Sequence, residues 1–217
     1  MAFSFPPQSY EVKSQRLVIR DPVPEDAEAF VDLMGKVENL PMGETEAMTG
    51  LTVDSVVARF GRWKKTSLAG KNAFLSVALR DTNQMVGWMG FNCFRTKEEF
   101  DGTVPERDEP TPGLEGRYLT DVGVNIDYRH RRKGYALEAV CSAVEFAFET
   151  IGCQVVRLET SLVNERWRGL MVAIGLGDFE EQAPSSYNGE VGCIYKVHKD
   201  AWQKVKADLK AKGKWYV

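Results

Sequence analysis

The sequence predicts a mixed α/β fold in which a strand, a basic turn and a helix form the centre of the sheet. Three observations lead to this fold class. Short segments with the composition of strands alternate with segments in which apolar residues recur at helical spacing. The turn "DYRHRRKG" joins one such strand directly to one such helix. A chain of 217 residues with 43% hydrophobic and 27% charged residues is typical of one globular domain.

Apolar patterning defines the expected elements of the first half of the chain. Residues 16–20, "RLVIR", have the β-branched and apolar content of a strand, and Pro24 is typical of the first turn of a helix. The predicted order is a strand at 16–20, a helix from Pro24 through Val37, a second helix over 53–63, and strands at 74–80 and 84–94.

The second half of the chain has the same mixture of patterns. Gly152 and Gly175 are expected to end helices, because glycine adopts the left-handed conformation of a helix C-cap at little cost. The predicted order is a strand at 118–126, a helix from near Gly134 to Gly152, a strand at 155–161, a short helix N-capped by Asn164, a strand at 191–197 and a basic tail helix from Asp200. We expect a single domain over 1–217, with 200–217 as its C-terminal tail.

One long segment breaks the pattern between two predicted strands. Residues 95–117 hold seven acidic and four basic residues, together with three prolines and three glycines. Such a composition does not supply the apolar periodicity of a core element. We therefore predict an exposed acidic excursion.

The bulk composition excludes several classes of protein. A net charge of −3 argues against a dedicated nucleic-acid binder, and no apolar run approaches the roughly 20 residues of a membrane span. The start of the chain lacks the pattern of a secretion signal, so we expect a cytoplasmic protein. We expect this protein to be a monomer or a homodimer. Two histidines and no paired cysteine spacing predict no metal site. Reduced, buried thiols are expected at Cys93, Cys141, Cys153 and Cys193.

The run of basic residues from Arg129 to Lys133 directly precedes Gly134 and the predicted helix. A helix N-terminus leaves backbone N–H groups unpaired and carries the positive end of the helix dipole. Glycine at 134 lets the backbone approach a ligand closely. A phosphate site and a solvated basic turn are equally compatible with these residues, whereas a nuclear-import signal is disfavoured inside a folded unit.

The segment Arg131-x-x-Gly134-x-Ala136 resembles the Q/R-x-x-G-x-G/A pyrophosphate loop of the GNAT acetyltransferase superfamily. The longer stretch "RRKGYALEAV…FAFETIG" is similar to the RimJ/RimL-like branch, which acetylates N-termini of ribosomal proteins. "SQRLVIRDPVPEDAEAFVDLM" resembles the first strand and helix of that family, and "LETSLVNERWRGLMVAIGL" resembles its later strand, Asn and helix. The resemblance covers most of the chain except 95–117 and the tail, and it implies a GNAT-type, mostly antiparallel central sheet flanked by helices.

The resemblance implies acetyl-CoA as cosubstrate, held at a central strand–turn–helix site. The pantetheine arm is expected along the strand edge from Val122 to Ile126, with the backbone N–H near Val124 as an oxyanion donor. Asn164 is expected to touch the pantetheine or the acceptor, although a simple N-cap explains it equally well. The residues that match the pyrophosphate loop are Arg131, Arg132, Lys133, Gly134, Tyr135 and Ala136.

The implied reaction is direct attack of a primary amine on the thioester, which requires the ammonium to lose a proton. At pH 7 that loss costs about 1 kcal/mol for a peptide α-amine and about 4–5 kcal/mol for a lysine-like amine. Asp121 and Glu159 are the candidate bases, each directly or through water. Either carboxylate could instead face solvent or pair with an arginine.

The sequence departs from the family pattern at Met171, where many GNAT enzymes carry a tyrosine that protonates the leaving thiolate. Met171 and Trp167 are expected in the core. Ser161, Tyr187 or water could replace the acid, or the thiol could leave as thiolate. The acceptor could be a protein N-terminus or a small amine. The absent tyrosine also permits a CoA-binding sensor or scaffold without turnover.

Overall fold

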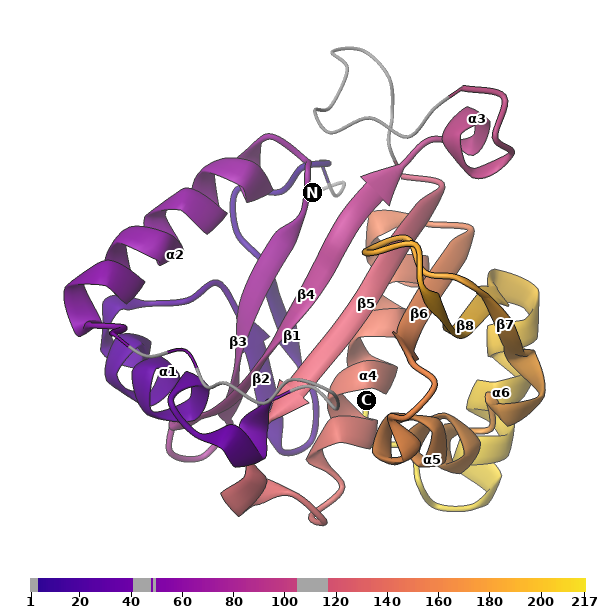
Figure 1. Ribbon diagram of the computed structural model, residues 1–217. Helices are drawn as coiled ribbons and strands as arrows, with labels where there is room; N and C mark the ends of the chain where they lie inside the picture. The colour runs from indigo at the N-terminus through magenta and orange to yellow at the C-terminus, as the bar shows by residue number, and fades with distance from the viewer. Residues whose placement is uncertain (1–3, 41–47, 49, 105–116) are drawn as a thin grey trace.

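The computed structural model describes residues 4–40, 48, 50–104 and 117–217 (Figure 1). Its described strands form one eight-stranded sheet in the order β1-β2-β3-β4-β5-β6-β8-β7. Every neighbouring pair is antiparallel except β5 and β6, which are parallel. The strands are β1 (Glu11–Lys13), β2 (Leu17–Arg20), β3 (Ala73–Leu79), β4 (Met85–Arg95), β5 (Leu119–Ile126), β6 (Val155–Ser161), β7 (Glu180–Pro184) and β8 (Val191–His198).

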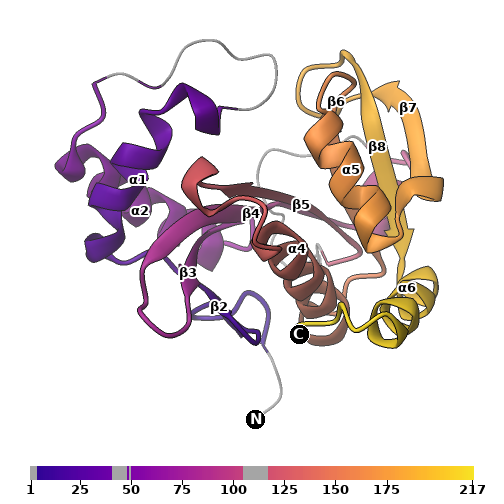
Figure 2. The ribbon, with the colours of Figure 1, turned by 90° about the horizontal axis from the view of Figure 1, so that it is seen from below.

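Helices cover both faces of this sheet. Helices α1 and α2 lie together over β3 and β4, and α4 lies on the opposite face (Figure 2). Helix α4 continues as a π-helical turn over Ala147–Ile151, and Gly152 ends it at φ 90°. The helices are α1 (Ala27–Met34), α2 (Val53–Leu68), α3 (Lys97–Phe100), α4 (Tyr135–Phe146), α5 (Glu165–Ile174) and α6 (Lys199–Ala211). The predicted fold class is confirmed, with a mostly antiparallel sheet flanked by helices.

The sheet opens between β5 and β6. Their ladder consists of the pairs Leu119↔Val155, Thr120↔Val156 and Asp121↔Arg157. Beyond Asp121, β5 continues its pairing with β4, and beyond Arg157, β6 continues its pairing with β8. The two strands therefore part after the pair Asp121↔Arg157, which we call the vertex. Figure 2 shows β5 and β6 apart from each other. The edge of β5 that faces this opening belongs to residues 122–126.

Two of the described strands and one of the described α-helices were not predicted. Strands β1 and β7 lie at the two edges of the sheet, and α3 lies at the start of the excursion. The prediction of a wholly exposed excursion is wrong for its first part, because Thr96 and Glu99 are buried and close a capping box around α3. Phe100 also packs against Tyr118, with 5.3 Å between their ring centroids. Residues 105–116 lie outside the described residues.

The expected burial of the four cysteines is confirmed. The described residues contain no helix long and apolar enough to cross a membrane. In the same part of the chain, no group of three or more His, Cys, Asp or Glu side chains is arranged to hold a metal ion.

Glu138, on α4, ties the start of the chain to the central helix. Its side chain is fully buried, and it accepts hydrogen bonds from Ser14 Oγ at 2.7 Å and from the Arg16 backbone N–H at 2.8 Å. The Arg16 Nε donates to Glu138 at 2.6 Å, and its Nη1 donates to the Lys133 carbonyl at 2.9 Å. Arg16 also lies between the rings of Tyr135 and Tyr216. This contact fixes the first turn of α4 against the segment before β2.

We expect Glu138→Ala to lower the free energy of unfolding by about 1–3 kcal/mol, because it leaves Arg16 and Ser14 without their buried acceptor. Glu149→Ala is the matched control, since Glu149 is exposed and pairs with Lys199 at 3.5 Å. The control should change stability by less than about 0.5 kcal/mol. Urea unfolding of both variants would check this, and equal losses would contradict the role assigned to Glu138.

Candidate active site

The turn after β5 presents a helix N-terminus. A short 3₁₀ helix covers Tyr128–His130, and Arg132 and Gly134 follow with φ values of 63° and 82°. Gly134 is the N-cap of α4, and none of the described side chains accepts a cap hydrogen bond from this helix. The first backbone N–H groups of α4 are therefore available to an anion.

The positive charge of this turn is smaller than the sequence indicates. Arg129 is paired with Asp127 and, at 2.5 Å, with Asp32. Burial, followed by the charge of Lys133, lowers the pKa of His130, so its imidazole is uncharged at neutral pH. Arg132 and Lys133 have exposed side chains. Among the described residues they form no ion pair, unlike Arg129, so their charge remains at the surface beside Gly134.

The side chain of Arg131 forms hydrogen bonds within the protein. Its Nε donates to the Ile126 carbonyl at 3.1 Å, and its Nη2 donates to Asn39 Oδ1 at 3.4 Å. Asn39 also accepts from the Tyr128 backbone N–H at 2.6 Å. Arg131 therefore holds the turn against the end of β5.

The strand residues expected to line the pantetheine arm lie along the open edge of β5. Val122 and Ile126 are buried in the main core cluster, and Val124 packs against it. Their side chains thus face α4, and the backbone remains as the part of this edge that faces the opening. Tyr135 and Ala136 form the first turn of α4 and also pack against the core.

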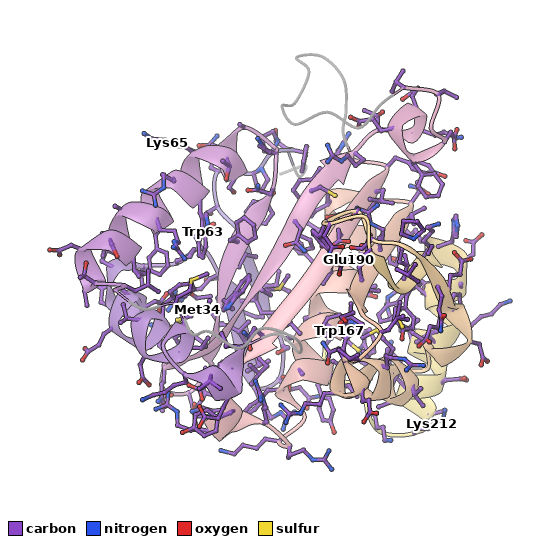
Figure 3. All side chains as sticks on the ribbon, in the orientation of Figure 1. Met34, Trp63, Lys65, Trp167, Glu190 and Lys212 are labelled. Carbon is purple, nitrogen blue, oxygen red and sulfur yellow. The ribbon has the colours of Figure 1, made fainter. Side chains whose placement is uncertain are left out.

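Asn164 is an N-cap, as one of the two predictions for it states. Its Oδ1 accepts from the Trp167 backbone N–H at 3.1 Å, and its Nδ2 donates to Thr160 Oγ1 at 2.8 Å. The Trp167 side chain packs against the main core cluster from α5 (Figure 3). A contact of Asn164 with a ligand stays a prediction.

Asp121 lies at the vertex where β5 and β6 part, and it is 1% exposed. Its Oδ1 accepts from Asn92 Nδ2 at 2.7 Å and from the hydroxyl of Tyr187. Its Oδ2 accepts from Arg157 Nε at 3.1 Å. Burial raises the pKa of Asp121, and these three partners, which favour the charged form, do not fully offset it.

Glu159 lies two residues beyond Arg157 on β6. Its side chain is also about 1% exposed, and its Oε1 lies 2.8 Å from Arg157 Nε. Three further hydrogen bonds reach it from the turn between β7 and β8: from Ser185 Oγ at 2.9 Å, from the Ser186 backbone N–H at 3.0 Å and from Ser186 Oγ at 2.9 Å. The two candidate bases thus share Arg157 and belong to one buried network.

The turn between β7 and β8, residues 185–190, closes over this network. Figure 3 labels Glu190 on this turn, which reaches across β6 towards β5. The sequence pointed to Tyr187 as a possible acid, but gave no signal for Asn92, Arg157, Ser185 or Ser186. Their positions depend on strand register and on an edge strand, β7, that has no apolar alternation.

The strand–turn–helix site and the opened sheet together define an acetyltransferase fold. The model of the family "Acetyltransferase (GNAT) domain" matches residues 16–177. The chain therefore belongs to the GNAT acetyltransferase family.

Known proteins similar to this chain include a curated fungal enzyme. This chain is 26% identical over 141 residues to the FsC-acetyl coenzyme A-N(2)-transacetylase of Aspergillus fumigatus. The match covers 59% of this chain and 57% of that protein, so the chain spans little more than half of its relative's length.

Two solved structures share the fold at low sequence identity. RimJ of Mycobacterium smegmatis, in complex with CoA-disulfide, has a TM-score of 0.69 and 12% identity, covering 99% of this chain and 100% of that one. The microcin C7 self-immunity acetyltransferase MccE, in complex with acetyl-CoA and AMP, has a TM-score of 0.62 and 10% identity, covering 84% and 92%.

Met171 is fully buried in the main core cluster, which confirms its predicted core position. We expect Met171→Tyr to lower the free energy of unfolding by about 1–3 kcal/mol, because the larger side chain overpacks the core and buries a hydroxyl. Val172→Tyr, at the neighbouring position that is 68% exposed, is the control and should change stability by less than about 0.5 kcal/mol. Thermal unfolding of both variants would check this. A gain in acetyl transfer by Met171→Tyr, without loss of stability, would place the residue in the site instead.

Proposed function

We propose that this protein is an acetyl-CoA-dependent N-acetyltransferase that transfers the acetyl group directly to a primary amine in a ternary complex. The observation that carries the proposal is the continuous path from the turn at Arg132–Gly134, along the open edge of β5, to the carboxylates at the vertex. An anion-binding helix N-terminus, an unpaired strand edge and a buried base are the three parts that thioester aminolysis needs.

The residues present fit the donor. The diphosphate would lie on the N–H groups at the start of α4, beside Arg132 and Lys133. A Cβ at Gly134 would lie 3.2 Å from Arg16 Nη2, and φ 82° disfavours any side chain there, so the backbone is bare at this point. The edge from Val122 to Ile126, which no described strand pairs, offers backbone N–H and C=O groups to the amide groups of a pantetheine arm, apart from the Ile126 carbonyl that Arg131 already contacts. Bound acetyl-CoA supplies the thioester carbon that the amine attacks.

The chain's own residues would orient the donor and stabilise the transition state. The backbone N–H near Val124 would stabilise the negative charge that develops on the thioester oxygen in the transition state. Met171 has a thioether, which carries no proton to donate to the sulfur, and it is buried in the core. A thiol has a pKa of about 8.5, so its thiolate is an adequate leaving group without a dedicated acid.

The acceptor is either a small amine or a protein N-terminus. The name of the Aspergillus fumigatus relative, an acetyl coenzyme A-N(2)-transacetylase, supports a nitrogen atom as the acceptor and does not distinguish these two. The sequence resemblance to the RimJ/RimL-like branch supports a protein N-terminus. The test is acetyl-CoA consumption with a short peptide carrying a free N-terminal serine, with Nα-acetyl-lysine and with putrescine. Turnover of one or more acceptors is expected, and CoA binding without any turnover would favour a CoA-binding sensor.

Gly134→Glu should weaken CoA binding by at least about tenfold, or ~1.4 kcal/mol, because a Cβ and a carboxylate would enter the space of the diphosphate. Gly152→Glu is the matched control, because Gly152 also has a positive φ, 90°, with nothing within 4 Å of its ideal Cβ. It should bind CoA normally. Arg132→Ala and Lys133→Ala should each cost about 1–3 kcal/mol of binding free energy. Calorimetry would measure all four, and unchanged affinity in Gly134→Glu would remove the donor site from this turn.

Asp121→Asn and Glu159→Gln should distinguish the two candidate bases. Loss of the true base should lower turnover by about 10²–10⁴-fold at neutral pH, with partial recovery at high pH, where the amine loses its proton unaided. Steady-state rates across pH would reveal the pattern, and unfolding curves would show whether either variant loses the network around Arg157. Wild-type pH profiles in both variants would mean that neither carboxylate is the base.

A further inference from the structure

Asp121 is separated from the face where an amine would arrive. It is 1% exposed, and its oxygens are occupied by Asn92, Tyr187 and Arg157. Two of these partners cannot carry a proton between the acceptor and the carboxylate. The Asn92 amide does not titrate, and the Arg157 guanidinium stays charged, since the nearby carboxylates of Asp121 and Glu159 outweigh the effect of its burial.

Tyr187 is the partner that connects Asp121 with the surface. The residue is 59% exposed, yet its hydroxyl donates to the buried Asp121 Oδ1. The hydroxyl oxygen of Tyr187 in turn accepts from Asn92 Nδ2 at 2.9 Å. A hydroxyl has one hydrogen and two lone pairs, so one lone pair of Tyr187 remains to accept a proton from an incoming ammonium.

The hydrogen-bonded node of Tyr187, Asn92 and Asp121 lies against the strand edge assigned to the thioester. The Asn92 Nδ2 is 3.4 Å from the position that a Cβ of Gly123 would take. Gly123 stands between Val122 and Val124, and its lack of a side chain leaves the strand bare at this point. An amine placed to attack a thioester at Val124 would therefore lie beside this node.

We propose that Tyr187 is a catalytic proton relay that passes a proton from the acceptor ammonium to Asp121. The inference rests on the proposed acetyltransferase function. The ammonium gives a proton to the Tyr187 oxygen while the Tyr187 hydroxyl proton moves to Asp121 Oδ1, which leaves a neutral amine. The amine nitrogen then bonds to the thioester carbon, and the C–S bond breaks. The second nitrogen proton goes to the departing sulfur, which gives the free thiol, and Asp121 returns its proton to solvent through Tyr187.

The charges around the relay favour this direction. Arg157 and Glu159 on β6 and Tyr187 on the β7–β8 turn are the titratable groups that face Asp121, and Asn92 faces it from β4 as a neutral donor. Burial raises the pKa of Asp121, so this carboxylate holds a proton more readily than an exposed aspartate does. Although the residue as a whole is exposed, burial of its hydroxyl, and then the charge of Asp121, raise the pKa of Tyr187 well above its usual value. The hydroxyl therefore returns to the protonated form after each transfer.

The test compares Tyr187→Phe, which keeps the ring, with wild type. The acceptor is whichever of the serine peptide, Nα-acetyl-lysine and putrescine turns over fastest, and hydroxylamine serves as a second amine that is mostly uncharged at neutral pH. With Nα-acetyl-lysine or putrescine we expect a loss in turnover of about 10²–10⁴-fold at pH 7 that shrinks as pH rises. With the serine peptide, whose α-amine is already partly neutral at pH 7, the loss should be less than about tenfold and should also shrink as pH rises. With hydroxylamine the loss should be less than about tenfold, because no proton has to be removed before attack.

Two further variants separate a relay from a structural role. Asp121→Asn should show the same pH-dependent loss, and the double variant should lose no more than the worse single variant, because the two groups act in one chain. Asn188→Ala loosens the same turn, since Asn188 bonds Glu190 at 3.2 and 3.1 Å without touching Asp121. It should keep the wild-type pH profile.

The possible outcomes distinguish failure of the Tyr187 relay from failure of the proposed acetyltransferase function. A wild-type pH profile in Tyr187→Phe, equal losses with hydroxylamine, or additive losses in the double variant would overturn the relay while acetyl transfer by the wild type stands. Absence of wild-type turnover with every amine would overturn the proposed function and the relay together.

Discussion

The end of the parallel ladder at the Asp121–Arg157 pair is the constraint on which the rest of the site depends. Two adjacent parallel strands require a crossover connection, and α4 supplies it between β5 and β6. Because β6 leaves β5 after this pair, the edge of β5 stays open up to Ile126, and the turn that starts α4 lies at the end of the same edge. One strand register therefore produces both the open edge and the exposed helix N-terminus.

A cluster of buried charged side chains lies at that vertex. One guanidinium, Arg157, lies between the buried carboxylates of Asp121 and Glu159. A buried pair of anions with a single cation requires further hydrogen bonds to offset its loss of solvation. Asn92 supplies one from β4, and the turn 185–190 supplies the others. Strands β7 and β8 are thus coupled to the chemistry through the polar turn that connects them.

Most of the central elements could be predicted from the sequence, because their signals are local. The helix stop at Gly152 and the N-cap at Asn164 follow from conformational preference, and both lie where they were expected. Strand β7, "EEQAP", could not be predicted, since its residues disfavour strands and its pairing with β8 alone defines it. The sequence also indicated Asp121 and Glu159 separately. Their shared Arg157 is visible once the register of β5 on β6 is known. The positive charge of the run from Arg129 to Lys133 was overestimated from the sequence, because Asp32, which pairs with Arg129, is distant in the chain.

The burial of the four cysteines makes the opening of the fold measurable without a substrate. Burial raises the pKa of Cys141 and of Cys153 to about 12, so neither thiol is nucleophilic at neutral pH in the closed fold. Alkylation then reports the transient states in which each cysteine meets solvent. Cys141 lies in α4, and Cys93 lies in β4 with its sulfur 4.0 Å from Arg157. Peptide-resolved labelling rates of Cys93 and Cys141 would therefore compare local opening of the vertex with local opening of the helical core in a single sample.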